Sequence, residues 1–243
     1  MLDAVEHLRG LEYPGRIIVL GRSENGDNVA VYAMTGRKPE TRARKLVQKR
    51  ENIYVDPIEE SARSGRHNDI FFYQATNLRV RELAISNGVH TTDLPGNRNA
   101  LHNLIKGLGK HTFEPDSNST PRIGGIIEPD NAALGIVKRD ESGETIRQYF
   151  EVPLVDGTGS MIYTYAEPNR DPTPSFVGEP VRISLPGYSP RATARTIYDA
   201  LARSDPAQDF RIAAACIYIH PKKYYAKGAA QIEIINRVDE EKK

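Results

Sequence analysis

The stretch RIIVLGRSENGDNVAVYAMTG, residues 16–36, consists of two apolar, β-branched runs with a polar turn between them. Valine and isoleucine favour strands, because their branched side chains pack well on a pleated surface. The pair Asn25–Gly26 lies in the turn, and Asn-Gly between two such runs is a strong local signal for a hairpin. The stretch therefore predicts antiparallel strands at residues 16–22 and 29–36.

Outward from this hairpin, most predicted strands follow one another through short turns rather than through helices. The apolar periodicity predicts a helix within residues 97–110, which Gly109 can end. A second helix is predicted at residues 194–203, and a short helical lead-in at 1–12. The basic segment 40–51 is predicted to be a helix or a loop. Further strands are predicted at residues 52–56, 69–80, 81–88, 121–128, 132–140, 146–155, 160–167, 210–219 and 229–237.

This order of elements is typical of the α+β class, with layered and mainly antiparallel sheets covered by a few helices. No Gly/Ser-rich linker or internal repeat divides the chain, so residues 1–243 are predicted to form a single domain, with 1–12 as an N-terminal extension. The Pro-rich segment 168–190 is long for a connection without secondary structure, which indicates a binding loop or part of an interface. A homo-oligomer is compatible with this pattern.

The composition excludes several classes of function. The chain has 33 basic and 32 acidic residues, so it lacks the positive excess of a general nucleic-acid-binding protein. No segment is apolar over the length of a membrane span, and residues 1–10 lack the apolar core of a signal peptide. The single cysteine, Cys216, lies in an apolar run and is predicted to be a packing residue, which fits a cytoplasmic protein.

The common catalytic signatures do not occur in the sequence. There is no P-loop, no Cys-x-x-Cys pair, no H-E-x-x-H and no G-x-S-x-G motif. The six histidines are scattered, and none is spaced for metal ligation with another ligand. The sequence therefore predicts no metal site.

Polar clusters follow several of the predicted strands. Thr35 lies at the end of the second strand of the hairpin, and Arg37 and Arg42 follow it. Two guanidinium groups and a hydroxyl suit a phosphate monoester, because arginine presents a planar fork of donors that matches phosphate oxygens. The alternative interpretation is a solvated basic stretch that continues through residues 44–50.

Two further clusters leave a choice between a site and a scaffold. By strand alternation, Tyr73, Asn77 and Arg79 would share one face, which would line a cavity or form an exposed sheet surface. The next cluster lies in SNGVHTTD, where an Asn-Gly pair is typical of a hairpin turn but the polar groups suit a substrate pocket. Its candidate residues are Asn87, Gly88 and His90.

The segment FEPDSNSTPRIGG, residues 113–125, has the most candidate catalytic and binding side chains. Glu114 and Asp116 are candidate proton acceptors, and Arg122 is a candidate partner for an anion. The alternative is an ordinary loop after a helix, with Arg122 in a surface ion pair.

These clusters, in this order, resemble a known family. The segments YPGRIIVLGRS, VYAMTGRKPETR, NDIFFYQATNLRV, ISNGVHTTD, FEPDSNSTPRIGGII and GIVKRD are similar to archaeal-type IMP cyclohydrolases and their bacterial relatives, and YTYAEPNRDPTPSFVGEP is similar to the C-terminal half of that family. The resemblance covers roughly residues 13–182. It implies the four-layer αββα sandwich of N-terminal-nucleophile hydrolases, without the processed nucleophile. It also implies closure of the purine ring of 5-formamidoimidazole-4-carboxamide ribonucleotide to IMP, with loss of water.

The resemblance implies roles for the clusters in a reaction that needs no cofactor. Tyr73 would donate to the formyl oxygen or relay a proton, and Glu114 or Asp116 would be the carboxylate near the reacting groups. The implied substrate-binding residues are Thr35, Arg37, Arg42, Asn77, Arg79, Asn87, Gly88, His90 and Arg122.

The sequence departs from the archaeal pattern in the second strand of the hairpin. An arginine follows the family tyrosine that matches Tyr32, whereas Ala33 stands here, and a serine pair is replaced by Thr35 and Gly36. The candidates to replace the missing arginine are Arg22, Lys38 and Arg79. These departures leave open a different formamido-imidazole nucleotide or amide as substrate, or a nucleotide-binding regulatory protein without catalysis.

Overall fold

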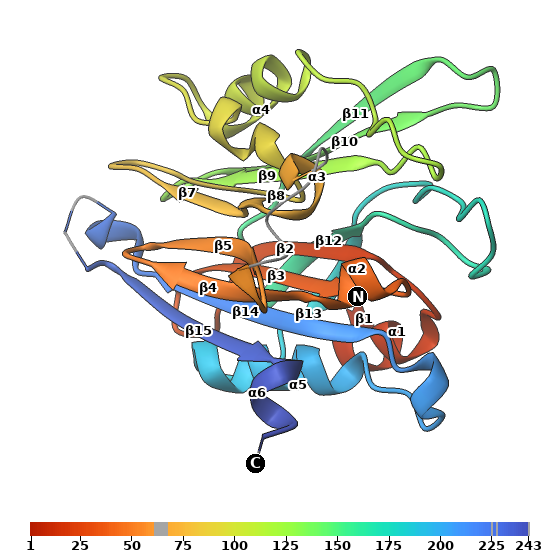
Figure 1. Ribbon diagram of the computed structural model, residues 1–243. Helices are drawn as coiled ribbons and strands as arrows, with labels where there is room; N and C mark the ends of the chain where they lie inside the picture. Colours follow the sequence, from red (N-terminus) through yellow and green to blue (C-terminus); the bar gives the residue numbers. More distant parts are fainter. Residues whose placement is uncertain (61–67, 225, 227, 243) are drawn as a thin grey trace.

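A computed structural model describes residues 1–60, 68–224, 226 and 228–242. This part of the chain is an α+β protein with three mostly antiparallel sheets (Figure 1). The first sheet has seven strands, in the order β1 (Leu2–Asp3), β13 (Val181–Ser184), β12 (Thr158–Tyr163), β2 (Arg16–Arg22), β3 (Asn28–Thr35), β14 (Arg211–Ile219) and β15 (Ala230–Asn236). The second has five, in the order β11 (Thr145–Val152), β10 (Ala132–Arg139), β9 (Arg122–Ile127), β8 (Leu83–Ser86) and β7 (Thr76–Leu78). The third consists of β4 (Arg44–Lys49), β5 (Asn52–Pro57) and β6 (Tyr73–Gln74).

The predicted hairpin is confirmed, and it lies in the middle of the seven-stranded sheet. Strands β2 and β3 pair antiparallel, with Arg22 opposite Asn28. The turn is closed by the backbone N–H of Ser23, which donates to the carbonyl of Asp27 at 2.8 Å. Gly26 has a φ of +79°, a conformation that glycine adopts without the steric penalty of a side chain.

The two predicted long helices also form, although the second begins and ends earlier than the predicted range 194–203. Helix α4 (Ala100–Leu108) is capped by the Asn99 side chain and ends at Gly109. Helix α5 (Pro190–Ala200) begins at a Ser189 cap with proline in its first turn, and α1 (Ala4–Gly10) forms the lead-in. The short elements are α2 (Pro39–Arg42), α3 (Asn68–Phe71), α6 (Arg237–Glu240) and the 3₁₀ turns Val89–Asp93, Pro206–Gln208 and Pro221–Lys223.

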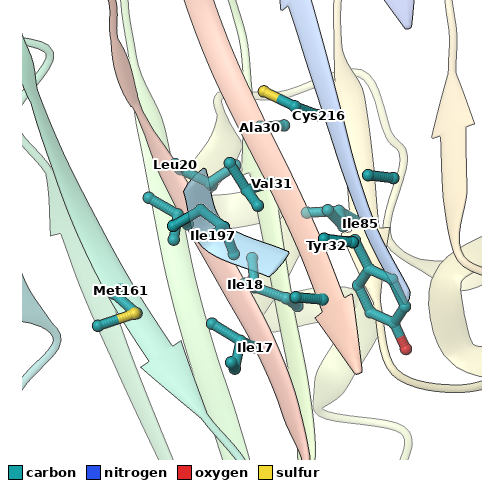
Figure 2. Packing of buried hydrophobic residues seen from close by; sticks show 14 of the residues in the cluster. Ile17, Ile18, Leu20, Ala30, Val31, Tyr32, Ile85, Met161, Ile197 and Cys216 are labelled. Carbon is teal, nitrogen blue, oxygen red and sulfur yellow. The ribbon is translucent and has the colours of Figure 1, made fainter. Parts of the chain in front are cut away.

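The two large sheets face each other, with helices on their outer sides (Figure 1). The main core lies between the sheets and includes Leu20 of β2 and Ile85 of β8, both of which appear in Figure 2. Leu104 and Leu108 of α4 pack in a smaller core on the outer face of the five-stranded sheet. Helix α5 packs on β14 and β15. Among the described residues, no helix has the length and apolar character needed to cross a membrane.

Three expectations from the sequence are wrong. Residues 44–49 of the segment predicted as a helix or loop form strand β4, which pairs with β5. The chain after β8 forms a 3₁₀ turn instead of a hairpin, because β8 pairs with the distant β9. The Pro-rich segment 168–190, expected to be a loop, contains β13, which pairs with β12, while its role in binding or at an interface stays a prediction.

The fourth correction concerns the predicted strand 69–80. Its first residues belong to helix α3, and its strand part is divided between two sheets, since Tyr73 lies in β6 and Asn77 in β7. The chain leaves the three-stranded sheet and enters the five-stranded sheet around Ala75. The assumption that Tyr73, Asn77 and Arg79 share one face of one strand therefore does not hold.

Gly21 allows β2 and β12 to approach closely, and we expect Gly21→Ala to lower the free energy of unfolding by roughly 3 kcal/mol. A Cβ at this position would overlap the carbonyl oxygen of Thr158 and lie 2.6 Å from the Cα of Gly159, and neither backbone atom can move without displacing the strand. Urea unfolding measures the loss. Gly10→Ala is the control, because no atom lies within 4 Å of its Cβ position. Equal stability of the two variants would contradict the prediction.

Candidate functional site

A cavity of about 250 Å³ lies beside the start of β2. Arg16 begins β2, Arg44 begins β4, and Glu114 lies between α4 and β9, so three separate segments bring charged side chains to one place. The charged residues that line the cavity are Arg16, Arg37, Lys38, Arg44, Glu114 and Asp116. Cations outnumber acids in this lining, which favours an anionic or oxygen-rich ligand.

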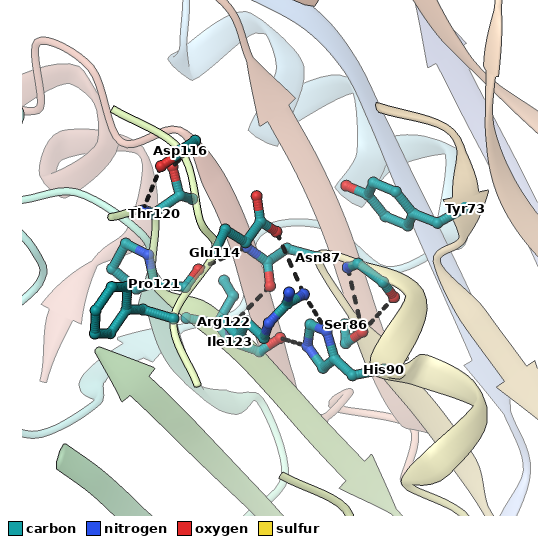
Figure 3. Close-up of polar contacts among 12 residues, drawn as sticks. Tyr73, Ser86, Asn87, His90, Glu114, Asp116, Thr120, Pro121, Arg122 and Ile123 are labelled. Atoms are coloured by element: carbon teal, nitrogen blue, oxygen red, sulfur yellow. Dashed lines mark hydrogen bonds and ion pairs between the residues drawn. The ribbon is translucent and has the colours of Figure 1, made fainter. Parts of the chain in front are cut away.

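Glu114 is buried between two guanidinium groups, and Figure 3 shows its contact with that of Arg122. Its Oε2 lies 3.9 Å from Nη2 of Arg16, and its Oε1 lies 3.7 Å from Nη1 of Arg122. Neither carboxylate oxygen has a hydrogen-bond partner among the described residues. Burial raises the pKa of Glu114 to about 7, although both arginines act to lower it. A carboxylate with this pKa can take a proton from a ligand near neutral pH.

Asp116 lines the same cavity, but its carboxylate is used within the loop. Its Oδ1 accepts a hydrogen bond from the backbone N–H of Thr120 at 2.8 Å, and its Oδ2 accepts from the Thr120 hydroxyl at 2.5 Å. That hydroxyl also lies 2.6 Å from the hydroxyl of Tyr165. Asp116 therefore shapes the loop, and Glu114 is the carboxylate with unused oxygens.

Arg122 connects Glu114 to a buried histidine. Nε2 of His90 lies 3.2 Å from the carbonyl oxygen of Ile123, which can only accept, so the ring proton is on Nε2. Nδ1 of His90 then accepts from Nη1 of Arg122 at 3.4 Å. Burial and the neighbouring Arg122 lower the pKa of His90 to about 3. The neutral imidazole thus orients the guanidinium group that contacts Glu114.

Asn87 and Gly88 build the wall behind this histidine. The amide of Asn87 donates to the carbonyl of Pro121 and accepts from the backbone N–H of Ile123, both at 2.8 Å. A Cβ on Gly88 would lie 3.0 Å from Nδ1 of His90, so glycine permits this close approach. These residues adjoin the site without lining the cavity.

Because Asn87 holds two buried backbone groups, we expect Asn87→Ala to lower the free energy of unfolding by roughly 3 kcal/mol. The alanine variant leaves a carbonyl and an N–H group without their partners in the interior. Urea denaturation of the wild type and the variant checks this value. Asn97→Ala serves as a matched control, since Asn97 is exposed. A variant as stable as the control would show that these bonds are dispensable.

Tyr73 lies in β6 and, like Asn87 and Gly88, is not among the residues that line the cavity. Its hydroxyl lies 2.6 Å from that of Tyr32, and both phenols are buried. Burial, reinforced by Tyr73, raises the pKa of Tyr32, so that phenol is neutral. Figure 3 shows the Tyr73 ring directed toward the side that holds Glu114. By contrast, Asn77 lies in β7 of the five-stranded sheet, and Arg79 lines a different cavity.

The structure separates the residues predicted to bind phosphate. Arg37 lines the cavity, and it donates to Asp171 at 2.7 Å and to two neighbouring side chains of the Pro-rich segment. Arg42 does not line this cavity, because its Nη2 donates to the carbonyl of Asp209 at 2.7 Å. The Thr35 hydroxyl makes its hydrogen bonds with the backbone of Gly15.

The sequence missed Arg16 and Arg44, which are 5% and 2% exposed. One feature of the sequence could have identified Arg16 as a site residue, because it is a charged residue at the start of a mainly apolar strand. Arg44 was assigned to the solvated basic stretch. Among the candidates to replace the missing family arginine, Lys38 lines the cavity, whereas Arg22 donates to a backbone carbonyl and Arg79 lies elsewhere.

In the part of the chain that the structure describes, no group of three or more histidine, cysteine or acidic side chains is arranged to hold a metal ion.

Comparison with known proteins relates the site to a family. The model of the family described as IMP cyclohydrolase-like protein matches residues 13–223. IMP cyclohydrolase of Methanothrix thermoacetophila is 27% identical over 192 residues, which cover 76% of this chain and 85% of that protein. IMP cyclohydrolase of Methanocaldococcus jannaschii is 26% identical over 159 residues, covering 63% of this chain and 73% of that protein.

Proposed function

The chain belongs to the IMP cyclohydrolase-like family, whose model matches most of its length, and we propose that it is an IMP cyclohydrolase. The substrate would be 5-formamidoimidazole-4-carboxamide ribonucleotide. The carboxamide nitrogen bonds to the formyl carbon, and the formyl oxygen becomes a hydroxyl group. That hydroxyl then leaves as water, with one hydrogen from the carboxamide and one from the formamide nitrogen.

The state of Glu114 is the observation that carries this proposal. A carboxamide is a poor nucleophile, so its attack is helped by a base that removes a proton as the new bond forms. Glu114 has unused oxygens in a cationic cavity. With a pKa of about 7, a large fraction of its carboxyl groups is ionised at neutral pH, and the carboxylate is still basic enough to take a proton. We assign the proton transfer to Glu114 rather than to Asp116, whose oxygens are occupied by Thr120.

Tyr73 is the proposed donor to the formyl oxygen. Its hydroxyl is paired with that of Tyr32, which can supply or accept a proton in a relay. Arg37 and Lys38 are the proposed contacts for the phosphate, because both line the cavity and Lys38 is exposed. Attack within one molecule gains mainly from positioning, which accounts for several kcal/mol of the barrier.

The proposal extends to the fold. Two facing sheets with helices on their outer sides support the four-layer αββα architecture of N-terminal-nucleophile hydrolases. The continuous core between the sheets supports one domain for residues 1–243. The attacking group in the proposed reaction is the carboxamide nitrogen of the substrate, so the reaction needs no nucleophile from the protein.

The test adds the formamido ribonucleotide to the purified protein and follows the absorbance change of ring closure. We expect turnover well above the uncatalysed rate, with Tyr73→Phe reducing kcat. Folded protein that gives no turnover would refute the cyclohydrolase assignment. IMP binding without turnover would instead favour a regulatory nucleotide-binding protein.

A further inference from the structure

Two buried arginines in the cavity have unused donors. Arg44 donates Nε to the carbonyl of Thr41 at 2.9 Å, but its Nη2 has no partner among the described residues. Arg16 has an unpartnered Nε, and its Nη2 lies 3.9 Å from Glu114. Buried donors without acceptors are unfavourable, so this arrangement suits a ligand that brings an oxygen to both guanidinium groups.

The other arginines near the site are less buried than Arg16 and Arg44, and each already donates to a protein group. Arg37 donates to side chains of the Pro-rich segment, and Arg42 donates to the backbone carbonyls of Gly36 and Asp209. Arg122 donates its Nε to a backbone carbonyl at 2.9 Å. Among the described residues near the site, Arg16 and Arg44 are therefore the buried guanidinium groups with donors left for a ligand.

The two arginines are also close enough to affect each other. Burial lowers the pKa of Arg44, and the neighbouring Arg16 lowers it further. Both act on the Glu114 carboxyl as well, since each stabilises its ionised form. A proton acceptor and two cations thus share one small volume.

We propose that Arg16 and Arg44 bind the carboxamide oxygen of the substrate, with Nε of Arg16 and Nη2 of Arg44 as donors. This inference rests on the proposed function, because the two arginines would position the carboxamide that attacks the formyl carbon. The nitrogen and oxygen of a carboxamide are neighbours, so a nitrogen that faces Glu114 presents its oxygen to the adjacent guanidinium groups. When Glu114 removes the proton, negative charge moves onto that oxygen, where the two cations stabilise it.

The position of the arginines argues against the phosphate as their ligand. A phosphate dianion there would lie beside the Glu114 carboxylate and repel it. The exposed Lys38 and the half-buried Arg37 leave the phosphate a better place at the rim.

Product binding provides the sharpest test, because the carboxamide oxygen remains in IMP as the exocyclic oxygen of the base. We compare IMP with purine ribonucleotide, which lacks that oxygen and the hydrogen on the adjacent ring nitrogen, by calorimetry on wild type, Arg44→Ala and Arg44→Lys. Arg44→Ala should weaken IMP binding roughly 10- to 100-fold and change purine ribonucleotide binding less than about 3-fold. Arg191→Ala is the control, since the Arg191 side chain is 86% exposed.

The outcomes separate this inference from the proposed function. Equal losses for the two nucleotides, or no loss for either, would overturn the assignment of Arg44 to the oxygen. Arg44→Lys retains a charge, so it replaces the alanine variant if thermal melting shows that alanine prevents folding. A wild type without turnover would refute the cyclohydrolase activity, whereas the comparison of the two nucleotides would still decide what Arg44 binds.

Discussion

Replacing Glu114 by glutamine is expected to lower kcat for ring closure by roughly 10²- to 10⁴-fold. Glutamine keeps the shape of the side chain, but its amide cannot take a proton from the carboxamide. Steady-state absorbance assays of both proteins measure the effect. Glu24→Gln is the matched control, because Glu24 is exposed and lies outside the cavity. A glutamine variant within about threefold of the wild type would exclude Glu114 as the base.

The same residue should determine the pH dependence of the wild type. Because the pKa of Glu114 is about 7, its carboxyl is mostly protonated at pH 6 and mostly ionised at pH 8. We expect kcat/KM to rise with pH, with a midpoint near 7, and we expect this rise to be absent from the residual activity of Glu114→Gln. A flat wild-type profile between these pH values would contradict the assignment.

The second large effect is on the pH dependence of stability, where Glu114→Gln should lose less stability than the wild type between pH 5 and pH 8. The pKa of Glu114 is raised from 4.5 to about 7 by burial, so the folded state binds a proton more tightly than the unfolded state. The resulting stabilisation is complete below pH 4.5 and is lost as the pH rises through 7. The loss amounts to about 3 kcal/mol, which a neutral glutamine does not undergo.

Urea unfolding at pH 5 and pH 8 measures this difference. The free energy of unfolding of the wild type should fall between these values by about 2 to 3 kcal/mol more than that of Glu114→Gln. Together with the loss of turnover, this result would show that the ionised form of Glu114 supports catalysis but destabilises the folded protein. Parallel pH profiles for the two proteins would mean that Glu114 titrates normally.

Local signals in the sequence predicted the elements whose formation depends on neighbouring residues. The hairpin of β2 and β3 follows from two β-branched runs around Asn-Gly, and α4 follows from its apolar period between the Asn99 cap and Gly109. Strand β4 was missed because its lysine, leucine and glutamine residues suit a helix, and only pairing with β5 makes it a strand.

Only part of the candidate site carries a local signal in the sequence. The segment around Glu114 carried a recognisable cluster of polar residues, and the family resemblance pointed to it. The proposal of Glu114 rather than Asp116 as the base depends on which carboxylate oxygens Thr120 occupies, and no spacing of residues reveals that. Arg42 and Arg44 looked alike in a basic stretch, yet the first turns toward Asp209 and the second into the cavity.

The sequence by itself determined the class of fold, the central hairpin, the two long helices and the family of the chain. Only the tertiary structure decided which charges are buried together, because Arg16, Arg44 and Glu114 come from segments far apart in the chain. Burial and neighbouring charges set the pKa and the unused hydrogen-bonding capacity of a side chain, and both depend on long-range packing. The chemistry proposed for this cavity therefore arises from the packing of segments that carry only weak signals separately.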